Sequence, residues 1–78
     1  MRRPTERDLF TKACRLSRKL GRDFGLSYIA ADRLWIPSYT ESENTLGIVC
    51  CESTHTKTAA IAAILNDFIE IDKAGGKP

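Results

Sequence analysis

Between residues 5 and 21, apolar side chains recur every three or four positions, which is the spacing of one face of an α-helix. The apolar positions are Leu9, Ala13, Leu16 and Leu20. Thr5 suits the N-cap of such a helix, and Gly21 suits its end, because glycine readily adopts left-handed backbone angles. The sequence therefore predicts an amphipathic helix between these two residues.

The opposite side of this predicted helix is basic. Its cations are Lys12, Arg15, Arg18, Lys19 and Arg22. Clustered lysines and arginines on one helix face are typical of phosphate-binding surfaces, although a helix face that is simply solvated has the same composition. Two interpretations therefore stay open: a solvated face, or a surface that binds an acidic protein or a nucleic acid.

Short apolar runs replace the helical spacing after the first helix. RLWIPSY (33–39) and TLGIVCCE (45–52) are rich in strand-forming residues, and TESEN (40–44) between them is rich in turn-forming residues. This pattern predicts a β-hairpin, in which Pro37 indicates an edge strand or a bulge because proline has no N–H. LSYIAA (26–31) is either an additional strand or an irregular segment.

A second helix is predicted by KTAAIAAILNDF (57–68), which contains four alanines. Its larger apolar residues again follow helical spacing: Ile61, Ile64, Leu65 and Phe68. FIEID (68–72) then predicts a short last strand. The expected order is α-β-β-α-β, in a single α+β domain over residues 1–78 with both helices on one face of an antiparallel sheet. This is a ferredoxin-like order without its first strand.

Several motifs together resemble a family of small bacterial ferredoxin-like proteins of unassigned function. The motifs are WIPSY (35–39), the acidic turn that follows, LGIVC (46–50) and TAAI (58–61). The resemblance spans about residues 9–68 and implies a homodimer that pairs through its sheets. Some members of the family are described as nickel-binding, so the resemblance also implies nickel or another transition metal as a cofactor.

The chain departs from the family pattern in three places. Residues 1–4 are too few for the family's first strand, and extra residues separate Gly21 from Trp35. Cys51 stands where relatives carry an apolar or aromatic residue. The first strand is central in the family's sheet, so we expect its place to be filled by residues 26–31 or by a strand of a second chain.

The segment CCESTH (50–55) gathers residue types that bind metal ions. The candidate ligands are Cys50, Cys51, Glu52 and His55. Adjacent strand residues point to opposite faces, so the two cysteines are not expected to hold one ion within one chain, and the C-x-x-C spacing of strong metal motifs does not occur. A metal site would therefore join one cysteine to His55 and Glu52 and be completed by a second chain. The alternative makes one cysteine a core residue and places the other at an interface.

Trp35 and Tyr39 share one face of the predicted hairpin and, with Val49, form the candidate ligand or dimer face; packing in the core is the competing interpretation. Alternation in the strand over 45–52 makes both of its faces apolar or small. One face holds Leu46, Ile48 and Cys50, and the other holds Gly47, Val49 and Cys51. Two helices on one side leave the other face for another molecule. The sequence thus favours a homodimer that forms through the sheet.

Catalysis and membrane insertion are not indicated. No nucleophile, base and orienting group occur at a characteristic spacing, and the glycines do not form a phosphate-binding loop. No run of about 18 apolar residues predicts a membrane span, and the start of the chain lacks the apolar stretch of a secretory signal. Three cysteines are an odd number for a disulfide framework. We therefore expect a cytoplasmic protein without enzymatic activity.

The sequence favours two functions over a third alternative, a cysteine-dependent enzyme. The first is a small, non-enzymatic, dimerising ferredoxin-like module that binds a metal ion or a small ligand. The second is an interaction module that binds a protein or a nucleic acid through the basic face of the first helix. An α-β-β-β-α order would match a double-stranded RNA-binding domain, but such a domain carries a lysine cluster at the start of its last helix, where this chain has only Lys57.

Overall fold

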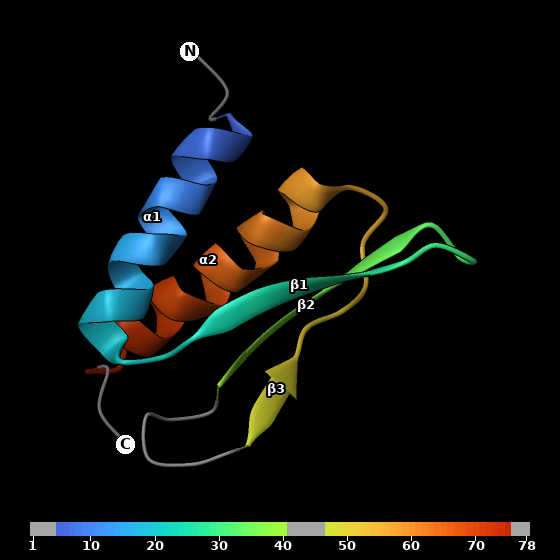
Figure 1. Ribbon diagram of the computed structural model, residues 1–78. Coiled ribbons are helices and arrows are strands. Elements are labelled where there is room, and N and C mark those ends of the chain that lie inside the picture. Colours follow the sequence, from blue (N-terminus) through green and yellow to red (C-terminus); the bar gives the residue numbers. More distant parts are fainter. Residues whose placement is uncertain (1–4, 41–46, 76–78) are drawn as a thin grey trace.

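The computed structural model describes residues 5–40 and 47–75, which form two helices and three strands. Their bounds are α1 Glu6–Leu20, β1 Phe24–Ile29, β2 Leu34–Thr40, β3 Ile48–Cys50 and α2 Lys57–Lys73. Figure 1 shows how these elements follow one another along the chain. The fold is therefore α+β with an antiparallel sheet.

The first predicted helix is confirmed, together with the residues that cap it. The Thr5 hydroxyl accepts a hydrogen bond from the Asp8 N–H, and the Asp8 carboxylate accepts one from the Thr5 N–H, each at 3.2 Å. These two bonds satisfy donors at the start of the helix that have no partner within it. At the other end, Gly21 has a φ of 68° and its N–H binds the Ser17 carbonyl. Glycine adopts this conformation at little cost, so α1 ends here.

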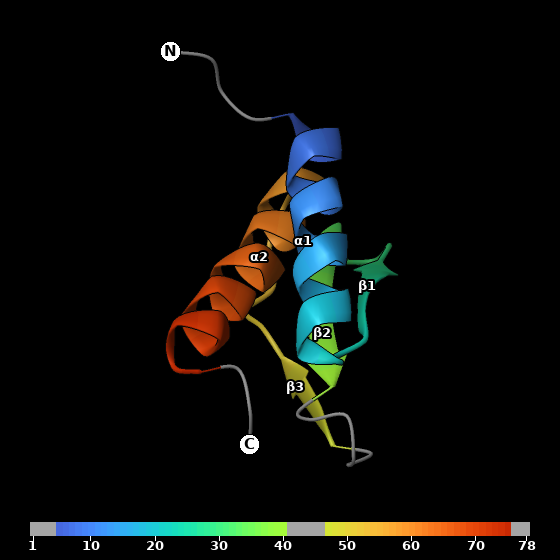
Figure 2. The same cartoon turned by 90° about the vertical axis from the view of Figure 1, so that its left-hand side faces the viewer.

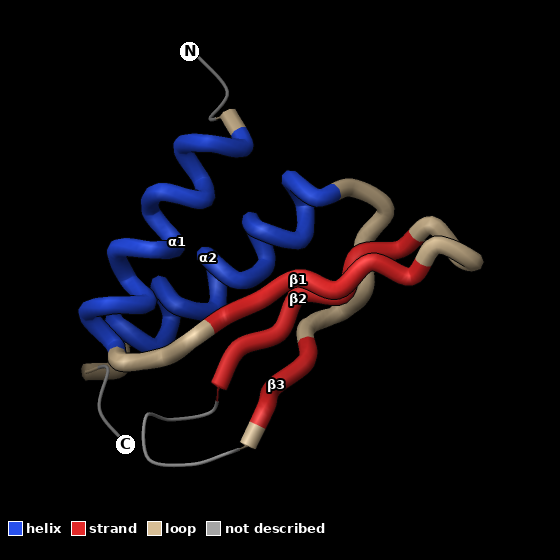
Figure 3. Tube along the Cα trace, in the orientation of Figure 1, coloured by secondary structure: helices blue, strands red, loops and turns tan. Residues whose placement is uncertain are grey.

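The strands lie in chain order in one sheet, with β2 in the middle (Figure 3). Tyr39 pairs with Phe24 on one side and with Val49 on the other, and directly paired residues point to the same face. We call this the inner face; its residues are Phe24, Leu26, Tyr28, Trp35, Pro37, Tyr39, Val49 and Cys51. We call the opposite one the outer face; its residues are Gly25, Ser27, Ile29, Leu34, Ile36, Ser38, Thr40, Ile48 and Cys50.

Pro37 lies in the middle strand, although proline favours edges or bulges. Between the Ser38–Cys50 pair and the Trp35–Thr54 bridge, β2 advances by three residues and the opposite segment by four. This one-residue offset is a bulge, so Pro37 lies where the regular ladder is interrupted and its missing N–H removes no regular ladder bond. Of the two positions that the sequence indicated for Pro37, the structure has the bulge.

The predicted last strand over residues 68–72 is wrong, because these residues belong to α2. Phe68 is fully buried and Ile71 is partly buried against the same core, so the helical spacing that begins at Ile61 continues through this segment. The described residues therefore follow the order α-β-β-β-α instead of α-β-β-α-β. β1 begins and ends two residues before the 26–31 segment that the sequence left open. Most of the predicted TESEN turn, and Leu46, lie outside the described residues.

Both helices pack on the inner face of the sheet (Figure 2). The Phe68 ring of α2 lies 5.9 Å from the Phe24 ring and 5.3 Å from the Tyr39 ring, both edge to face. Leu16 and Leu20 of α1 pack against the same cluster. Each such aromatic pair adds about 0.5–1.5 kcal/mol beyond the area it buries. Within residues 5–40 and 47–75, no helix covers the outer face.

Candidate functional site

A small polar cluster joins the sheet to α2. The Tyr39 hydroxyl donates a hydrogen bond to Asp67 Oδ2 at 3.0 Å, and the Cys51 thiol donates to the same oxygen at 3.5 Å. Because a thiol is a weak donor, the bond from Tyr39 contributes more of the two. The three side chains come from β2, from the residue after β3 and from α2, so the cluster fixes the position of α2 on the inner face.

Both donors of this cluster keep their protons at neutral pH. Burial, reinforced by the Asp67 carboxylate, raises the pKa of Tyr39 from 10.0 to about 12 and the pKa of Cys51 from 9.0 to about 11. Nucleophilic attack needs the thiolate, which is scarce at such a pKa. Cys51 therefore acts as a structural hydrogen-bonding residue.

The four predicted metal ligands do not converge within one chain. Cys51 packs against the inner core, whereas Cys50 is exposed on the outer face, as strand alternation predicts. Glu52 and His55 are exposed in the segment between β3 and α2. Among the described residues, no three histidine, cysteine or carboxylate side chains lie close enough together to hold a metal ion. The structure thus separates Cys50 from Cys51 and assembles no metal site in the part it describes.

Two residues of the predicted ligand or dimer face lie in the core. Tyr39 is 8% exposed, and Val49 packs against the same cluster. Trp35 is on the same face farther along the hairpin, where its ring centroid lies 4.8 Å from that of Tyr28 and 6.0 Å from Lys57 Nζ. Both helices cover the part of the inner face around Tyr39 and Val49, whereas no helix among the described residues covers the outer face.

Two of the five predicted basic residues form tertiary contacts through their side chains. Lys19 Nζ forms an ion pair with Asp72 Oδ1 of α2 at 3.0 Å. Arg22 is partly buried and donates a hydrogen bond from its guanidinium to the Thr40 carbonyl at 3.3 Å. Lys12, Arg15 and Arg18 are exposed and, within the described residues, form no ion pair or side-chain hydrogen bond. The basic face of α1 is therefore shorter than the sequence indicates.

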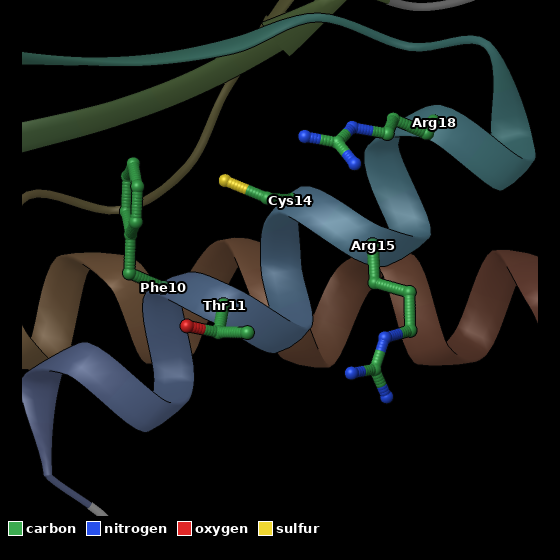
Figure 4. A pocket seen from close by; sticks show the side chains of 5 residues that line it. All are labelled: Phe10, Thr11, Cys14, Arg15 and Arg18. Atoms are coloured by element: carbon green, nitrogen blue, oxygen red, sulfur yellow. The ribbon is translucent and has the colours of Figure 1, made fainter.

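A hollow of about 450 Å³ lies along α1 (Figure 4). Its lining residues are Phe10, Thr11, Cys14, Arg15 and Arg18. Phe10, Cys14 and Arg18 point to the same side of α1, whereas the Arg15 side chain points away from them. The lining, taken from the described residues, has two guanidinium groups and no carboxylate, so the hollow is positively charged. We call it the α1 hollow.

Phe10 and Cys14 are missing from the sites that the sequence predicts, although their spacing carries a signal. Phe10 and Cys14 are four residues apart, as are Cys14 and Arg18, so the three share one flank of α1. Spacing cannot show the contact with Phe24 of β1, whose ring lies 5.8 Å from the Phe10 ring. This contact keeps an aromatic ring at the border of the hollow.

Comparisons with known proteins do not indicate a function for this chain. No protein-family model matches the chain, and searches of curated proteins and of solved structures each find no match. In the part of the chain that the structure describes, neither α1 nor α2 has the length and apolar character needed to cross a membrane.

Proposed function

We propose that this protein is a small, non-enzymatic binding module that works as a homodimer, with two copies packed through the outer faces of their sheets. The observation that supports this proposal is the apolar character of the outer face. Its apolar residues are Ile29, Leu34, Ile36, Ile48 and Cys50. Ile48 is 66% exposed and Ile29 is 37% exposed, and both helices lie on the other side of the sheet.

A second copy of the chain suits this face for two reasons. Within β1, β2 and β3 the outer face carries no charged side chain, so repulsion between two copies is limited to its edge, where the exposed Asp23 lines the same surface as Gly25 and Ile48. In a two-fold dimer the same patch of both copies forms the interface, so each apolar residue of the patch is buried once in each copy. Burying an isoleucine side chain contributes about 1.5–3 kcal/mol, which makes Ile48 the main expected contributor.

The size of the outer face limits the strength of the dimer. β2 has 7 residues, or about 23 Å at about 3.3 Å per residue, and three strands about 4.8 Å apart are about 15 Å wide. Such a face is smaller than the roughly 800 Å² per partner that stable interfaces bury. We therefore expect a dimer that dissociates on dilution.

Sedimentation velocity over a range of protein concentrations tests this proposal. The wild-type protein should shift from monomer to dimer as its concentration rises. Ile48→Glu should remain monomeric, because dimerisation would bury a charge without a partner. Ile69→Glu is the matched control: Ile69 is also exposed, at 36%, but lies on α2, so this variant should dimerise like the wild type.

Two results would contradict the proposal. One is a wild-type protein that stays monomeric at the highest concentration reached. The other is a loss of dimer in Ile69→Glu equal to that in Ile48→Glu, with both variants folded by circular dichroism. The second result would place the interface on the helices instead of the sheet.

The order of the elements favours a second candidate function, which is binding of a nucleic acid through α1. Three successive strands between two helices, with both helices on one face, is the order of double-stranded RNA-binding domains. A ferredoxin-like module needs a strand after the second helix, and the described residues contain none there. Double-stranded RNA-binding domains recognise mainly the shape and the backbone of the duplex. Exposed Arg15, Arg18 and Lys57 would supply the phosphate contacts.

Fluorescence anisotropy with a labelled RNA duplex at several salt concentrations tests this second candidate. Three phosphate contacts predict that the logarithm of the binding constant falls with the logarithm of salt concentration, with a slope of about −2 to −3. Arg15→Glu combined with Arg18→Glu should abolish binding, whereas Lys73→Glu, at the exposed end of α2, should leave most of it. Binding that is absent at low salt, or that does not depend on salt, would rule out this candidate.

A further inference from the structure

The α1 hollow has the size and the charge of a small-molecule site. Its volume of about 450 Å³ is within the range of roughly 300–1,000 Å³ that small-molecule sites occupy. Neither Arg15 nor Arg18 forms an ion pair or a side-chain hydrogen bond with another residue in the described part of the chain. Both guanidinium groups therefore remain available to an anion.

The hollow also offers an aromatic surface. Phe10 is 46% exposed, and its ring lies against Phe24 at 5.8 Å in an edge-to-face arrangement. This contact restrains the Phe10 side chain, so stacking a second flat ring on it costs little conformational entropy. The half-buried Cys14 side chain adds a small apolar surface next to it. A ligand that fills the hollow should therefore carry a flat ring as well as an anionic group.

We propose that the α1 hollow binds a nucleotide, with the phosphate held by Arg18 and Arg15 and the base stacked on Phe10. A phosphate has three acceptor oxygens, so it can bind two guanidinium groups at once, which a planar carboxylate does less well. Arg18 points to the same side as Phe10 and is the main phosphate ligand. Arg15 points to the other side, so it contacts the same phosphate only after a change of rotamer. The Thr11 hydroxyl donates to the Arg7 carbonyl at 2.8 Å and can still accept a hydrogen bond.

This inference goes beyond the proposed homodimer and does not depend on it. The α1 hollow belongs to a helix that packs on the inner face, whereas the dimer is proposed to form through the outer face. A failure of one proposal therefore leaves the other intact. Ile48→Glu should bind the nucleotide like the wild type.

Amide chemical-shift titrations of labelled protein with adenosine 5′-monophosphate test the proposal. We expect saturable shifts at residues 10–18, and binding by adenosine alone or by inorganic phosphate should be at least about tenfold weaker. Benzoate, which joins a ring to a carboxylate, should also bind at least about tenfold more weakly. Arg18→Gln should weaken binding by about tenfold or more, and Arg15→Gln by less. Arg33→Gln, at an exposed arginine between β1 and β2, is the matched control and should have no effect.

The same titration with a 5′-phosphorylated single-stranded oligonucleotide distinguishes a site for free nucleotides from a site for a nucleotide unit of a strand. If the oligonucleotide and the mononucleotide bind equally well to residues 10–18, the site takes free nucleotides. If the oligonucleotide binds more tightly with the same Arg18 dependence, the site holds a nucleotide unit of a strand. Both results support the proposal. Shifts that do not saturate, that are as strong with adenosine, phosphate or benzoate, or that survive Arg18→Gln unchanged would overturn it.

Discussion

At the residue scale, Asp67 shows how one carboxylate decides what its neighbours can do. It accepts hydrogen bonds from the Tyr39 hydroxyl and the Cys51 thiol, and both groups are kept protonated by burial and by its charge. The residue types cysteine and tyrosine alone are compatible with a reactive or metal-binding site. The contact with Asp67 turns them into a structural cluster between β2 and α2.

This cluster predicts that the protein loses stability in alkaline solution. The folded-state pKa values of Cys51 and Tyr39, about 11 and about 12, exceed their usual 9.0 and 10.0, so the unfolded chain releases these protons first. The stabilisation is complete below about pH 9 and is lost as the pH rises toward about 12. Urea unfolding under reducing conditions between pH 7 and pH 11 should show an unfolding free energy that falls over the upper part of this range.

Two tyrosine variants show whether Tyr39 causes this loss. Tyr39→Phe should be less stable at pH 7 by about 1 kcal/mol, because the Asp67 carboxylate loses its stronger donor. Its stability should also fall less at high pH. Tyr28→Phe is the control, since Tyr28 is 51% exposed, and should behave like the wild type. An alkaline loss that is the same in Tyr39→Phe and in the wild type would remove Tyr39 from this account.

At the element scale, the sequence predicts helices well where capping and spacing agree. Thr5 and Gly21 mark the ends of α1 correctly because both act through local hydrogen bonds and backbone angles. The segment over 68–72 was expected as a strand because isoleucine and phenylalanine favour strands, yet it continues α2. Burial of Phe68 and Ile71 on the same core outweighs that local preference. This packing is against residues of β1 and β2, so the sequence of residues 68–72 alone does not reveal it.

The helical placement of Phe68 leads to a stability prediction. Phe68→Leu should destabilise the protein by about 1–2 kcal/mol, because the smaller side chain loses the ring contacts with Phe24 and Tyr39 and leaves part of the space empty. Ile69→Leu, at the next position, should change stability by less than about 0.5 kcal/mol because that side chain is exposed. Thermal or urea unfolding measures both. Equal effects at the two positions would contradict the burial of Phe68 and the exposure of Ile69.

At the scale of the whole molecule, the sequence indicates that the sheet has two apolar faces but does not show which of them the helices cover. Tyr39 and Val49 were expected at an interface and lie in the core, while Ile48 is exposed on the opposite side. The alternation of residues along a strand does not show which face the helices cover, because that depends on the path of the chain between the elements. The basic face of α1 is shorter than its sequence indicates for a similar reason, because Lys19 forms an ion pair with Asp72, which is far from it in the sequence.

An isotope-filtered NOE experiment shows whether two copies of the chain pack through their outer faces. Labelled and unlabelled chains are mixed at a concentration where the dimer forms, so that only contacts between different chains are seen. We expect such contacts between the methyl groups of Ile36 and Ile48 on the outer face. Contacts that involve Ile69 of α2 instead, or no contacts between chains at all, would contradict it.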